Sequence, residues 1–429
     1  MGSTTDLPKV DFSSNFQNII NNALSSTPET RQAVDPSTEE LLYPVPLSKQ
    51  SDVDNVVSAA KAAFPAWRDL SYDERAQYIV RYADAVEANL AGLQELLMKE
   101  AGKPVSNAAG ELAFALAHLR ETAKIRLEDE GIEDGEERKA SVRYVPLGVG
   151  VGIVPWNYPV LLGLGKLDAA VLTGNTFIWK PSPYSPYTAL KLGEIAAQIF
   201  PPGVISFTGS TMTGKKVMQA SASTLKRLTL ELGGNDAAIV CEDVDVGKVV
   251  QKIGPMAFMH SDQICMDIKR LSVHEKIYDE FLAALVPVVK SFKFAKVKEL
   301  YSEIGKQNWQ VATGGEPAAR QAELWLRSLL APSCLFSNGL MRMRSLGRRA
   351  NNTNMGLGAS VWSNDIAKAE KLAKRLEAGS IWVNSHFELS PYVPSGGHKW
   401  SGIGMDWGVI GMKGWCNTQA YWVRKTIYL

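Results

Sequence analysis

The chain contains one long run without acidic or basic side chains. No Asp, Glu, Lys or Arg lies between Arg143 and Lys166, a stretch long enough in principle to cross a bilayer as a helix. Three prolines and five glycines in this stretch oppose a membrane helix, because proline removes a backbone donor and glycine weakens a helix. Parallel strands that are covered on both faces also read as continuous apolar runs. The run therefore predicts a buried parallel strand followed by a loop.

Strand-like and helix-like patterns alternate along the chain. The helix-like segments are 52–65, 73–100, 107–130, 187–200, 213–222, 274–293 and 364–377, and the strand-like ones are 139–146, 150–154, 176–180, 205–207, 237–240, 358–362 and 380–384. This alternation predicts an α/β protein with doubly wound parallel sheets. The tail 420–429 is β-prone and rich in aromatic residues.

The composition excludes several classes of function. With 429 residues, 45% of them hydrophobic, the chain can form two or three domains with large cores. Its 46 basic and 45 acidic residues leave a formal net charge of +1, so we expect no binding of nucleic acid or of an acidic membrane. The four cysteines have no CxxC spacing, and the N-terminus has no secretory pattern. We expect a cytoplasmic protein without a metal site.

Three polar residues stand in apolar or glycine-rich surroundings and together indicate carbonyl chemistry. Asn157 in PWNYP offers an amide donor, Glu231 in ELGGN a carboxylate base, and Cys265 in DQICM a thiol nucleophile. A thiolate that attacks a carbonyl creates an oxyanion that needs fixed donors, and the acyl group then needs an activated water for its release. Taken singly, each residue has an ordinary interpretation: a turn, the end of a strand, and a small buried side chain.

The segments around these residues resemble one enzyme family. VGIVPWNYPV, TFIWKPSPYSP, FTGST, TLELGGN and QICMDIKR occur in this order, and MGLGASVW, AGSIWVN and GGHKWSGIG follow them. The chain resembles the NAD(P)-dependent aldehyde dehydrogenases from about residue 30 to the C-terminus. The resemblance implies two Rossmann-like doubly wound domains and a small oligomerisation β-sheet.

The resemblance also implies domain boundaries. Residues 1–136 and 150–231 would form the cofactor-binding domain, 232–411 the catalytic domain, and 137–149 and 412–429 the oligomerisation strands. Strands shared between subunits would make a homodimer or homotetramer. A tail docked on its own subunit is the alternative, because edge pairing is not visible in a sequence.

The same resemblance implies the chemistry. Cys265 would attack a small-molecule aldehyde, the Asn157 amide and the Cys265 backbone N–H would hold the oxyanion, and Glu231 would activate the water that releases a carboxylic acid. The expected cofactor is NAD or NADP. The cofactor residues that the resemblance implies are Pro155, Trp156, Lys180, Ser182, Gly209, Ser210 and Leu232.

Physical arguments support two of these cofactor positions. Lys180 ends a predicted parallel strand, at the sheet edge where nucleotides bind in such folds. Gly209 and Ser210 precede a predicted helix, where backbone amides can meet a pyrophosphate. NAD-preferring relatives carry a carboxylate where this chain has Pro183, so the choice between NAD and NADP stays open. An ordinary surface lysine is the alternative for Lys180.

Two departures from the family pattern lie next to Cys265. Relatives read Asn-Ser-Gly-Gln where this chain has His260-Ser-Asp262-Gln. An ionised Asp262 close to the thiol would raise the pKa of Cys265. The glycine position also indicates a backbone conformation that Asp adopts reluctantly. None of the five histidines stands beside a nucleophile in a recognisable motif, which disfavours a Cys–His hydrolase.

A triphosphatase is the competing interpretation of residues 209–215. GSTMTGK matches most of a phosphate-binding loop, but Lys216 follows where that loop needs Ser or Thr to hold magnesium. We therefore expect no magnesium-dependent ATP turnover.

The segment between Glu316 and Asn351 departs most from the family. Relatives carry EEPFGP there, with a Glu for the nicotinamide ribose, whereas residues 321–347 read QAELWLRSLLAPSCLFSNGLMRMRSLG. Codons chosen for this segment can be read in a shifted frame, one base out of register, and they then encode SRIVVEEPFGPILPVLKWSDEDEVI. We infer a shifted reading frame that recovers near Arg348.

Three joins also look short beside the family. They lie at Val204–Ile205, Ala295–Lys296 and Ala318–Gln321. Loop deletion by divergence is the alternative for these joins, since loops tolerate deletion. The restored chain is defined as this chain with the frame corrected and the joins completed. An inactive family member that acts only as a subunit or binding protein is the alternative to an active dehydrogenase.

Overall fold

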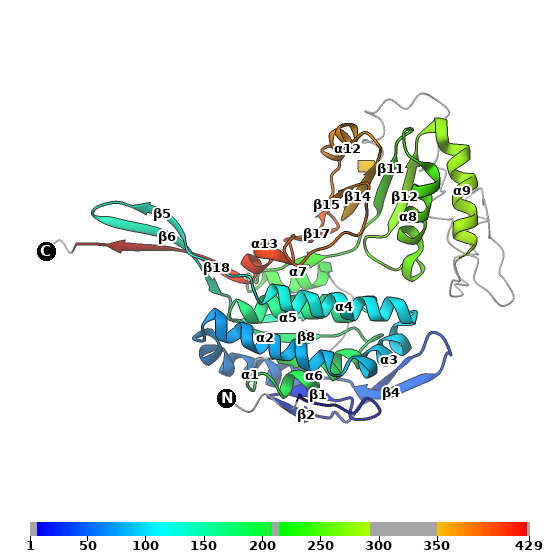
Figure 1. The fold of residues 1–429 in the computed structure, drawn as a ribbon. Coiled ribbons are helices and arrows are strands. Elements are labelled where there is room, and N and C mark those ends of the chain that lie inside the picture. The colour runs from blue at the N-terminus through cyan, green and yellow to red at the C-terminus, as the bar shows by residue number, and fades with distance from the viewer. Residues whose placement is uncertain (1–6, 204, 208–213, 292–349, 427–429) are drawn as a thin grey trace. The chain divides into compact units, whose positions relative to one another are not determined.

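The computed structural model of the chain describes residues 7–203, 205–207, 214–291 and 350–426 (Figure 1). The chain divides into two compact units. Unit 1 comprises Met1–Val217, Ser390–Pro394 and Asp406–Leu429, and unit 2 comprises Met218–Leu389 and Ser395–Met405. The C-terminal part of the chain therefore contributes to both units.

Unit 1 begins with two antiparallel strand pairs and four helices. Their bounds are β1 (Asn18–Ile20), β2 (Ala23–Ser25), β3 (Thr30–Val34), β4 (Leu41–Pro46), α1 (Gln50–Arg68), α2 (Tyr72–Glu87), α3 (Leu90–Ala101) and α4 (Val105–Thr122). A capping box fixes the start of α2: Glu74 N–H donates to Ser71 Oγ at 3.2 Å, and Ser71 N–H donates to Glu74 Oε2 at 2.7 Å. α3 ends at Gly102, whose φ of 63° is left-handed.

Two predicted helices were wrong in extent. The segment 73–100 forms two helices, because the Asn89 side chain donates to the Ala85 carbonyl at 2.8 Å, the acceptor that a continued helix would use. The helix predicted over 107–130 ends at Thr122. Its last predicted residue begins β5 (Glu130–Asp134), which pairs with β6 (Arg138–Pro146). Tertiary pairing outweighs local propensity here.

A parallel sheet with the order β7-β8-β9 lies at the centre of unit 1. It contains β7 (Val149–Ile153), β8 (Thr176–Lys180) and β9 (Ile205–Phe207), and α6 (Tyr187–Ala197) makes the crossover from β8 to β9. The parallel strand predicted from the uncharged run is confirmed as β7, but its predicted burial is wrong, because Val151 is 52% and Ile153 37% exposed.

The loop predicted after that strand is present at residues 154–158, but it is short, because α5 (Pro159–Leu172) takes up the rest of the uncharged run. Pro159 is compatible with the first turn, where its missing N–H is not needed. A Cβ on Gly163 would lie 1.7 Å from Trp179, and one on Gly165 would lie 2.7 Å from the Trp407 ring nitrogen. These glycines allow large aromatic rings to approach the helix closely, so they are packing residues and not helix breakers.

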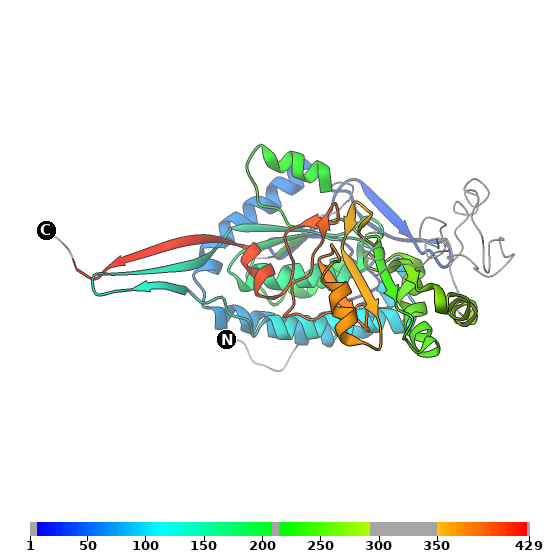
Figure 2. The same cartoon turned by 90° about the horizontal axis from the view of Figure 1, so that it is seen from above.

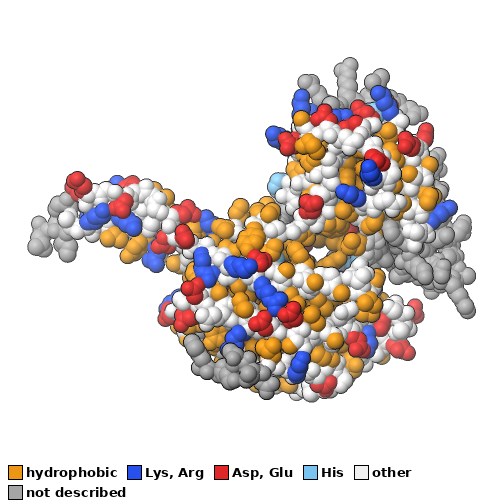
Figure 3. Space-filling model, viewed as in Figure 1, with side chains coloured by type: hydrophobic (Ala, Val, Ile, Leu, Met, Phe, Trp, Pro, Cys, Tyr) orange, Lys and Arg blue, Asp and Glu red, His pale blue; other side chains and the backbone are white. Residues whose placement is uncertain are grey.

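A three-stranded antiparallel arm extends from unit 1. β18 (Cys416–Arg424) pairs with β6 along its whole length, and β5 pairs with the other edge of β6. Figures 1 and 2 show the arm reaching away from the helices of the unit. Ile132 is 62% exposed and Trp422 57%, and hydrophobic side chains are visible on the arm in Figure 3. The predicted strand in the tail is confirmed as far as Arg424.

Unit 2 contains a parallel sheet with the order β12-β11-β14-β15. The strands are β11 (Asp236–Val240), β12 (Ile268–Val273), β14 (Gly358–Trp362) and β15 (Ser380–Val383). α8 (Val246–Phe258) and α9 (Tyr278–Lys290) cover one face and α12 (Ile366–Ala373) the other, with a buried apolar core on each side (Figure 1). The predicted α/β class with doubly wound layers is confirmed, although the sequence patterns did not identify α8 or β12.

Shorter elements complete the described fold. They are α7 (Gly214–Ala222), β10 (Leu230–Glu231), the 3-10 helices η1 (Met259–Asp262) and η2 (Glu275–Ile277), β13 (Met355–Gly356), β16 (His398–Lys399), β17 (Gly402–Ile403) and α13 (Gly408–Gly414). Within the described residues, no helix has both the length and the apolar character needed to cross a membrane.

Several predictions fall outside the described residues. They concern Gly209, Ser210, the shifted-frame segment 321–347, the joins at Ala295–Lys296 and Ala318–Gln321, and the Val204 side of the join at Val204–Ile205.

Candidate active site

Glu231 is placed by a strand pair between distant parts of the chain. β10 pairs antiparallel with β17, with Glu231 opposite Gly402. A Cβ at Gly402 would lie 2.0 Å from the Leu230 carbonyl oxygen, so only glycine allows the two strands to meet. Gly233 N–H donates to Glu231 Oε1 at 3.1 Å, with a Gly233 φ of +90°. The two glycines after Glu231 thus end the strand and turn the backbone toward the carboxylate.

Cys265 lies in a tight turn that leads into β12. Asp267 N–H donates to the Ile264 carbonyl at 3.3 Å, and Ile264 N–H donates to Asp267 Oδ2 at 3.0 Å. Cys265 is partly exposed, and its thiol lies near enough to the Glu231 carboxylate for that group to raise the pKa of the thiol. The structure therefore brings together the predicted nucleophile and the predicted base.

Burial raises the pKa of the Cys265 thiol well above its usual range, and the charges of Glu231 and Asp236 raise it further. Asp236 and Asp267 are themselves buried, and burial raises the pKa of Asp267 to about 8. Cys265 is therefore a thiol at neutral pH, and its deprotonation needs a base or an added positive charge.

The prediction about Asp262 is correct for the backbone and wrong for the charge. Asp262 has φ +61°, the left-handed conformation that favours glycine. Its carboxylate pairs with Lys269, whose ammonium also donates to the Asp262 carbonyl at 2.6 Å. The principal carboxylates that raise the pKa of Cys265 are instead Glu231, Asp236 and Asp267.

Sequence reasoning missed one histidine beside the nucleophile. His386 Nε2 lies 2.8 Å from the carbonyl oxygen of Met266, the residue after Cys265, and Nδ1 lies 3.0 Å from Ser360 Oγ. Burial lowers the pKa of His386 to about 4, so the ring is neutral at pH 7. Because a carbonyl only accepts, Nε2 carries the proton. The only sequence signal is that His386 closely follows the motif AGSIWVN.

The predicted cofactor residues of unit 1 gather at one sheet edge. Lys180 ends β8, and its carbonyl accepts from Val154 N–H at 2.9 Å, just before Pro155 and Trp156. Lys180 Nζ donates to the Pro181 carbonyl at 3.1 Å, and burial lowers its pKa to about 8. Ser182 is buried in the loop that follows. The Lys180 side chain lies where the parallel strands of unit 1 end, and in such folds this edge of the sheet can bind a phosphate or a ribose of a dinucleotide.

A buried ion pair anchors the loop that carries Asn157. Lys103 and Glu111 bond to each other with both side chains fully buried. Glu111 Oε1 accepts from the Val160 and Leu161 N–H groups at 2.9 and 3.1 Å, at the start of α5. The Lys103 ammonium lies 3.4 Å from the centroid of the Tyr158 ring. This network fixes both the loop and the helix that follows Asn157.

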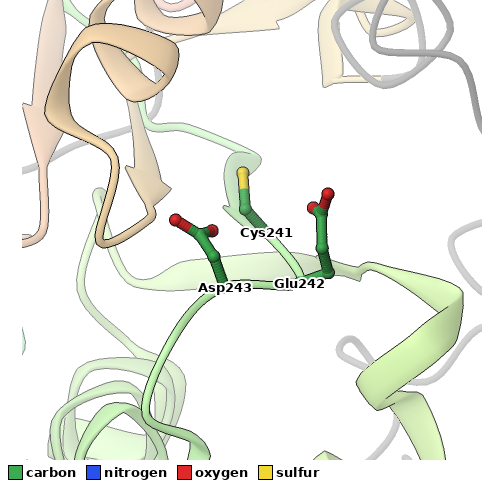
Figure 4. A group of neighbouring side chains, drawn as sticks. All are labelled: Cys241, Glu242 and Asp243. Carbon is green, nitrogen blue, oxygen red and sulfur yellow. The ribbon is translucent and has the colours of Figure 1, made fainter.

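A second polar group lies after β11. Cys241, Glu242 and Asp243 have ligand atoms within 4.8 Å of one another, and Figure 4 shows their side chains rising from consecutive residues. Lys368 Nζ lies 2.8 Å from Glu242 Oε2 and 3.8 Å from Asp243 Oδ1. The ammonium already supplies the positive charge that a metal would bring, so the group fits a structural ion pair.

The predicted site residues divide between the units. Glu231, Leu232 and Cys265 belong to unit 2, with Leu232 42% exposed next to the base. Asn157 belongs to unit 1, in the bend between β7 and α5. Pro155, Trp156, Lys180 and Ser182 also belong to unit 1.

The family model for the aldehyde dehydrogenase family matches residues 23–207, 202–310 and 344–421. Aldehyde dehydrogenase LUC3 of Fusarium sp is 35% identical over 97% of this chain and 100% of its own length. Retinaldehyde dehydrogenase 3 of Homo sapiens is 32% identical over 87% of this chain and 85% of its own length. The chain belongs to the aldehyde dehydrogenase family.

Solved structures agree with this assignment. The NAD+ complex of aldehyde dehydrogenase from Bacillus cereus has a TM-score of 0.88 and 25% identity, and the match covers 97% of this chain and 98% of that one. PnpE in complex with nicotinamide adenine dinucleotide has a TM-score of 0.88 and 26% identity, with 97% and 99% covered. The predicted family and fold class are confirmed, and aldehyde oxidation is the general activity they support.

The Lys103–Glu111 pair predicts a large effect on stability. Glu111→Ala in the restored chain should lower the free energy of unfolding by about 3–5 kcal/mol, because it leaves a buried ammonium without a partner. Lys103→Met combined with Glu111→Gln should recover most of this loss. Lys99→Met is the control: its pair with Glu95 is exposed and should contribute less than about 1 kcal/mol. Urea denaturation measures all three. A loss for Glu111→Ala as small as for Lys99→Met would contradict the prediction.

Proposed function

We propose that the enzyme oxidises an aldehyde to a carboxylic acid through a covalent intermediate on Cys265, with NAD or NADP as the hydride acceptor. The observation that carries the proposal is the proximity of the Cys265 thiol to the Glu231 carboxylate, in a chain of this family. A carboxylate near a partly buried thiol can remove its proton and later activate a water. His386 does not take this role, because its two ring nitrogens bond the Met266 carbonyl and Ser360 Oγ.

The residues act in order. The Cys265 thiol gives its proton to Glu231, and the sulfur then attacks the aldehyde carbon to form a thiohemiacetal. The Cys265 backbone N–H and the Asn157 amide stabilise the oxyanion, with the role of Asn157 carried over from the family resemblance. The bound cofactor supplies the oxidation. Glu231 loses the proton taken from Cys265 to solvent, and as a carboxylate it then deprotonates the water that cleaves the thioester, which releases the acid and the Cys265 sulfur.

The cofactor proposal rests on the carboxyl edge of the unit 1 sheet. Lys180, Ser182, Pro155 and Trp156 would hold the nucleotide there, with Leu232 on unit 2 and Gly209 and Ser210 as the remaining positions. Both structural relatives described above are complexes with NAD.

A homodimer or homotetramer is the proposed assembly. The arm of β5, β6 and β18 carries exposed apolar side chains, including Ile132 and Trp422, whose contact with water is unfavourable. Pairing or packing with a second copy would cover them. The domain boundaries proposed from the sequence place β6 and β18 in the oligomerisation sheet, whereas β5 lies within the range 1–136 proposed for the cofactor-binding domain.

The altered segments limit what this chain can do as written. The family match is interrupted between residues 310 and 344, around the segment we infer to be out of frame, and two matches overlap at 202–207, at the join Val204–Ile205. These interruptions support the restored chain as the active form. An inactive member that acts only as a subunit is the alternative for the unaltered chain.

The first prediction separates the roles of the two central residues. In the restored chain, Cys265→Ala should abolish aldehyde oxidation, whereas Glu231→Gln should leave a slowed but measurable first turnover and should slow thioester hydrolysis more strongly. Rapid-mixing measurement of NADH formation distinguishes a burst from steady-state turnover. Cys241→Ala is the control, because that thiol is buried and burial raises its pKa to about 11. An unchanged steady-state rate in Glu231→Gln would remove Glu231 from its role.

The second prediction concerns the cofactor and pH. NADP should bind at least as well as NAD, because Pro183 offers no carboxylate to repel a 2′-phosphate and Lys180 can pair with it. A bound phosphate raises the pKa of Lys180 above its free value of about 8, so NADP affinity should fall as pH rises through 8 while NAD affinity changes less. Titrations of NADPH and NADH fluorescence at pH 6.5 to 9.5 test this. A strong preference for NAD at pH 7 would refute it.

The third prediction concerns the unaltered chain. Loss of a strand and its connection would expose apolar faces to water. Truncation of a single large buried side chain already costs about 2–5 kcal/mol, and a whole domain is stable by only about 5–15 kcal/mol. We expect the 429-residue chain to be largely aggregated and without aldehyde oxidation, and the restored chain to be soluble, oligomeric and active. Size-exclusion chromatography and NAD(P)H production compare the two. A soluble and active unaltered chain would contradict the expectation.

A further inference from the structure

The turn that carries Cys265 is held by a directional chain of buried hydrogen bonds. Trp362 Nε1 donates to Ser360 Oγ at 3.1 Å. His386 Nε2 donates to the Met266 carbonyl at 2.8 Å, so Nδ1 of the neutral ring accepts from the Ser360 hydroxyl at 3.0 Å. Ser360, Trp362 and His386 are all at most 2% exposed. The order of donors leaves one tautomer of the imidazole.

Asp267 holds the other end of the same turn. Its side chain accepts from Ile264 N–H at 3.0 Å, while its own N–H donates to the Ile264 carbonyl. The Asp267 side chain is fully buried, and its Oδ1 has no hydrogen-bond partner among the described residues. A buried carboxyl group with one unused oxygen is unfavourable for stability alone.

We propose that His386 and Asp267 are positioning residues that fix the two ends of the turn 264–267 and thereby aim the Cys265 thiol and its backbone N–H at the carbonyl group of the substrate. The proposal rests on the function proposed for Cys265 and adds two residues to it. Neither residue touches the reacting atoms. Misplacement of a reacting group by about 1 Å can lower a rate about 100-fold, so small shifts of this turn matter.

Two probes of the thiol separate positioning from folding. Iodoacetamide alkylates a thiolate by displacing iodide, and no oxyanion forms. A p-nitrophenyl ester acylates the same sulfur: the C–S bond forms, the C–O bond to the aryl group breaks, and p-nitrophenolate leaves after an oxyanion intermediate that requires the turn's N–H. Both reactions proceed without the cofactor. The alkylation and acylation rate constants of each variant are taken from pH profiles. They are compared at full ionisation of Cys265, so that a change in the pKa of the thiol does not contribute.

The variants follow the hydrogen bonds. His386→Ala and Asp267→Ala should reduce the acylation rate constant of the thiolate about 10- to 100-fold and change the alkylation rate constant less than about 3-fold. Asp267→Asn keeps an oxygen for the Ile264 N–H and should retain most acylation. His386→Gln offers an amide donor to the Met266 carbonyl and should rescue part of it. His118→Ala is the matched control, because that imidazole is equally buried but bonds Asp168 in unit 1.

The measurements use the full chain in its soluble fraction and, in parallel, the restored chain, with the labelled cysteine identified by peptide mass. A wild-type protein in which neither probe reacts first at Cys265 would contradict the proposed function. If Cys265 reacts in the wild type but His386→Ala keeps the ratio of acylation to alkylation, the positioning role is wrong. A parallel loss of both rates, as expected for simple unfolding, would also overturn it.

Discussion

Two buried carboxylates hold the starts of the helices that follow the carboxyl edge of the unit 1 sheet. Glu111 accepts from the first N–H groups of α5, and Glu100 accepts from Tyr187 and Thr188 N–H at 2.6 and 3.1 Å at the start of α6. These helices follow the loops that carry Asn157 and Lys180. A carboxylate at a helix N-terminus satisfies donors that have no partner within the helix. The side chains of α3 and α4 thus determine where the chain leaves β7 and β8.

Burial of charge has opposite uses in the two units. In unit 1, Lys103 compensates Glu111, and the result is a rigid loop. In unit 2, burial keeps Cys265 protonated, and the nearby carboxyl groups of Glu231 and Asp236 raise the pKa of the thiol further. A positive charge that arrives with the cofactor would reverse this balance, because an opposite charge favours the thiolate. Cys265 would then become a reactive thiolate when the cofactor is bound.

The sequence predicted the α/β class, the strands of both parallel sheets except β12, and the residues Glu231 and Cys265 that the structure brings together. Its errors have physical causes. Gly163 reads as a helix breaker but makes room for Trp179, and residue 130 reads as helical but pairs with β6. His386 stands far from Cys265 along the chain, and only the folded sheet brings it to Met266. Propensity carries no information about such distant packing.

The pairing of β10 with β17 has a consequence for biosynthesis. Glu231 faces Gly402, which is synthesised long after Cys265. A nascent chain that has not yet reached β17 would carry the Cys265 thiol before the strand that orders the neighbouring carboxylate is present. Pairing over such a sequence separation is also slow to form. The arrangement of the proposed nucleophile and base thus depends on a segment that is translated much later than either residue.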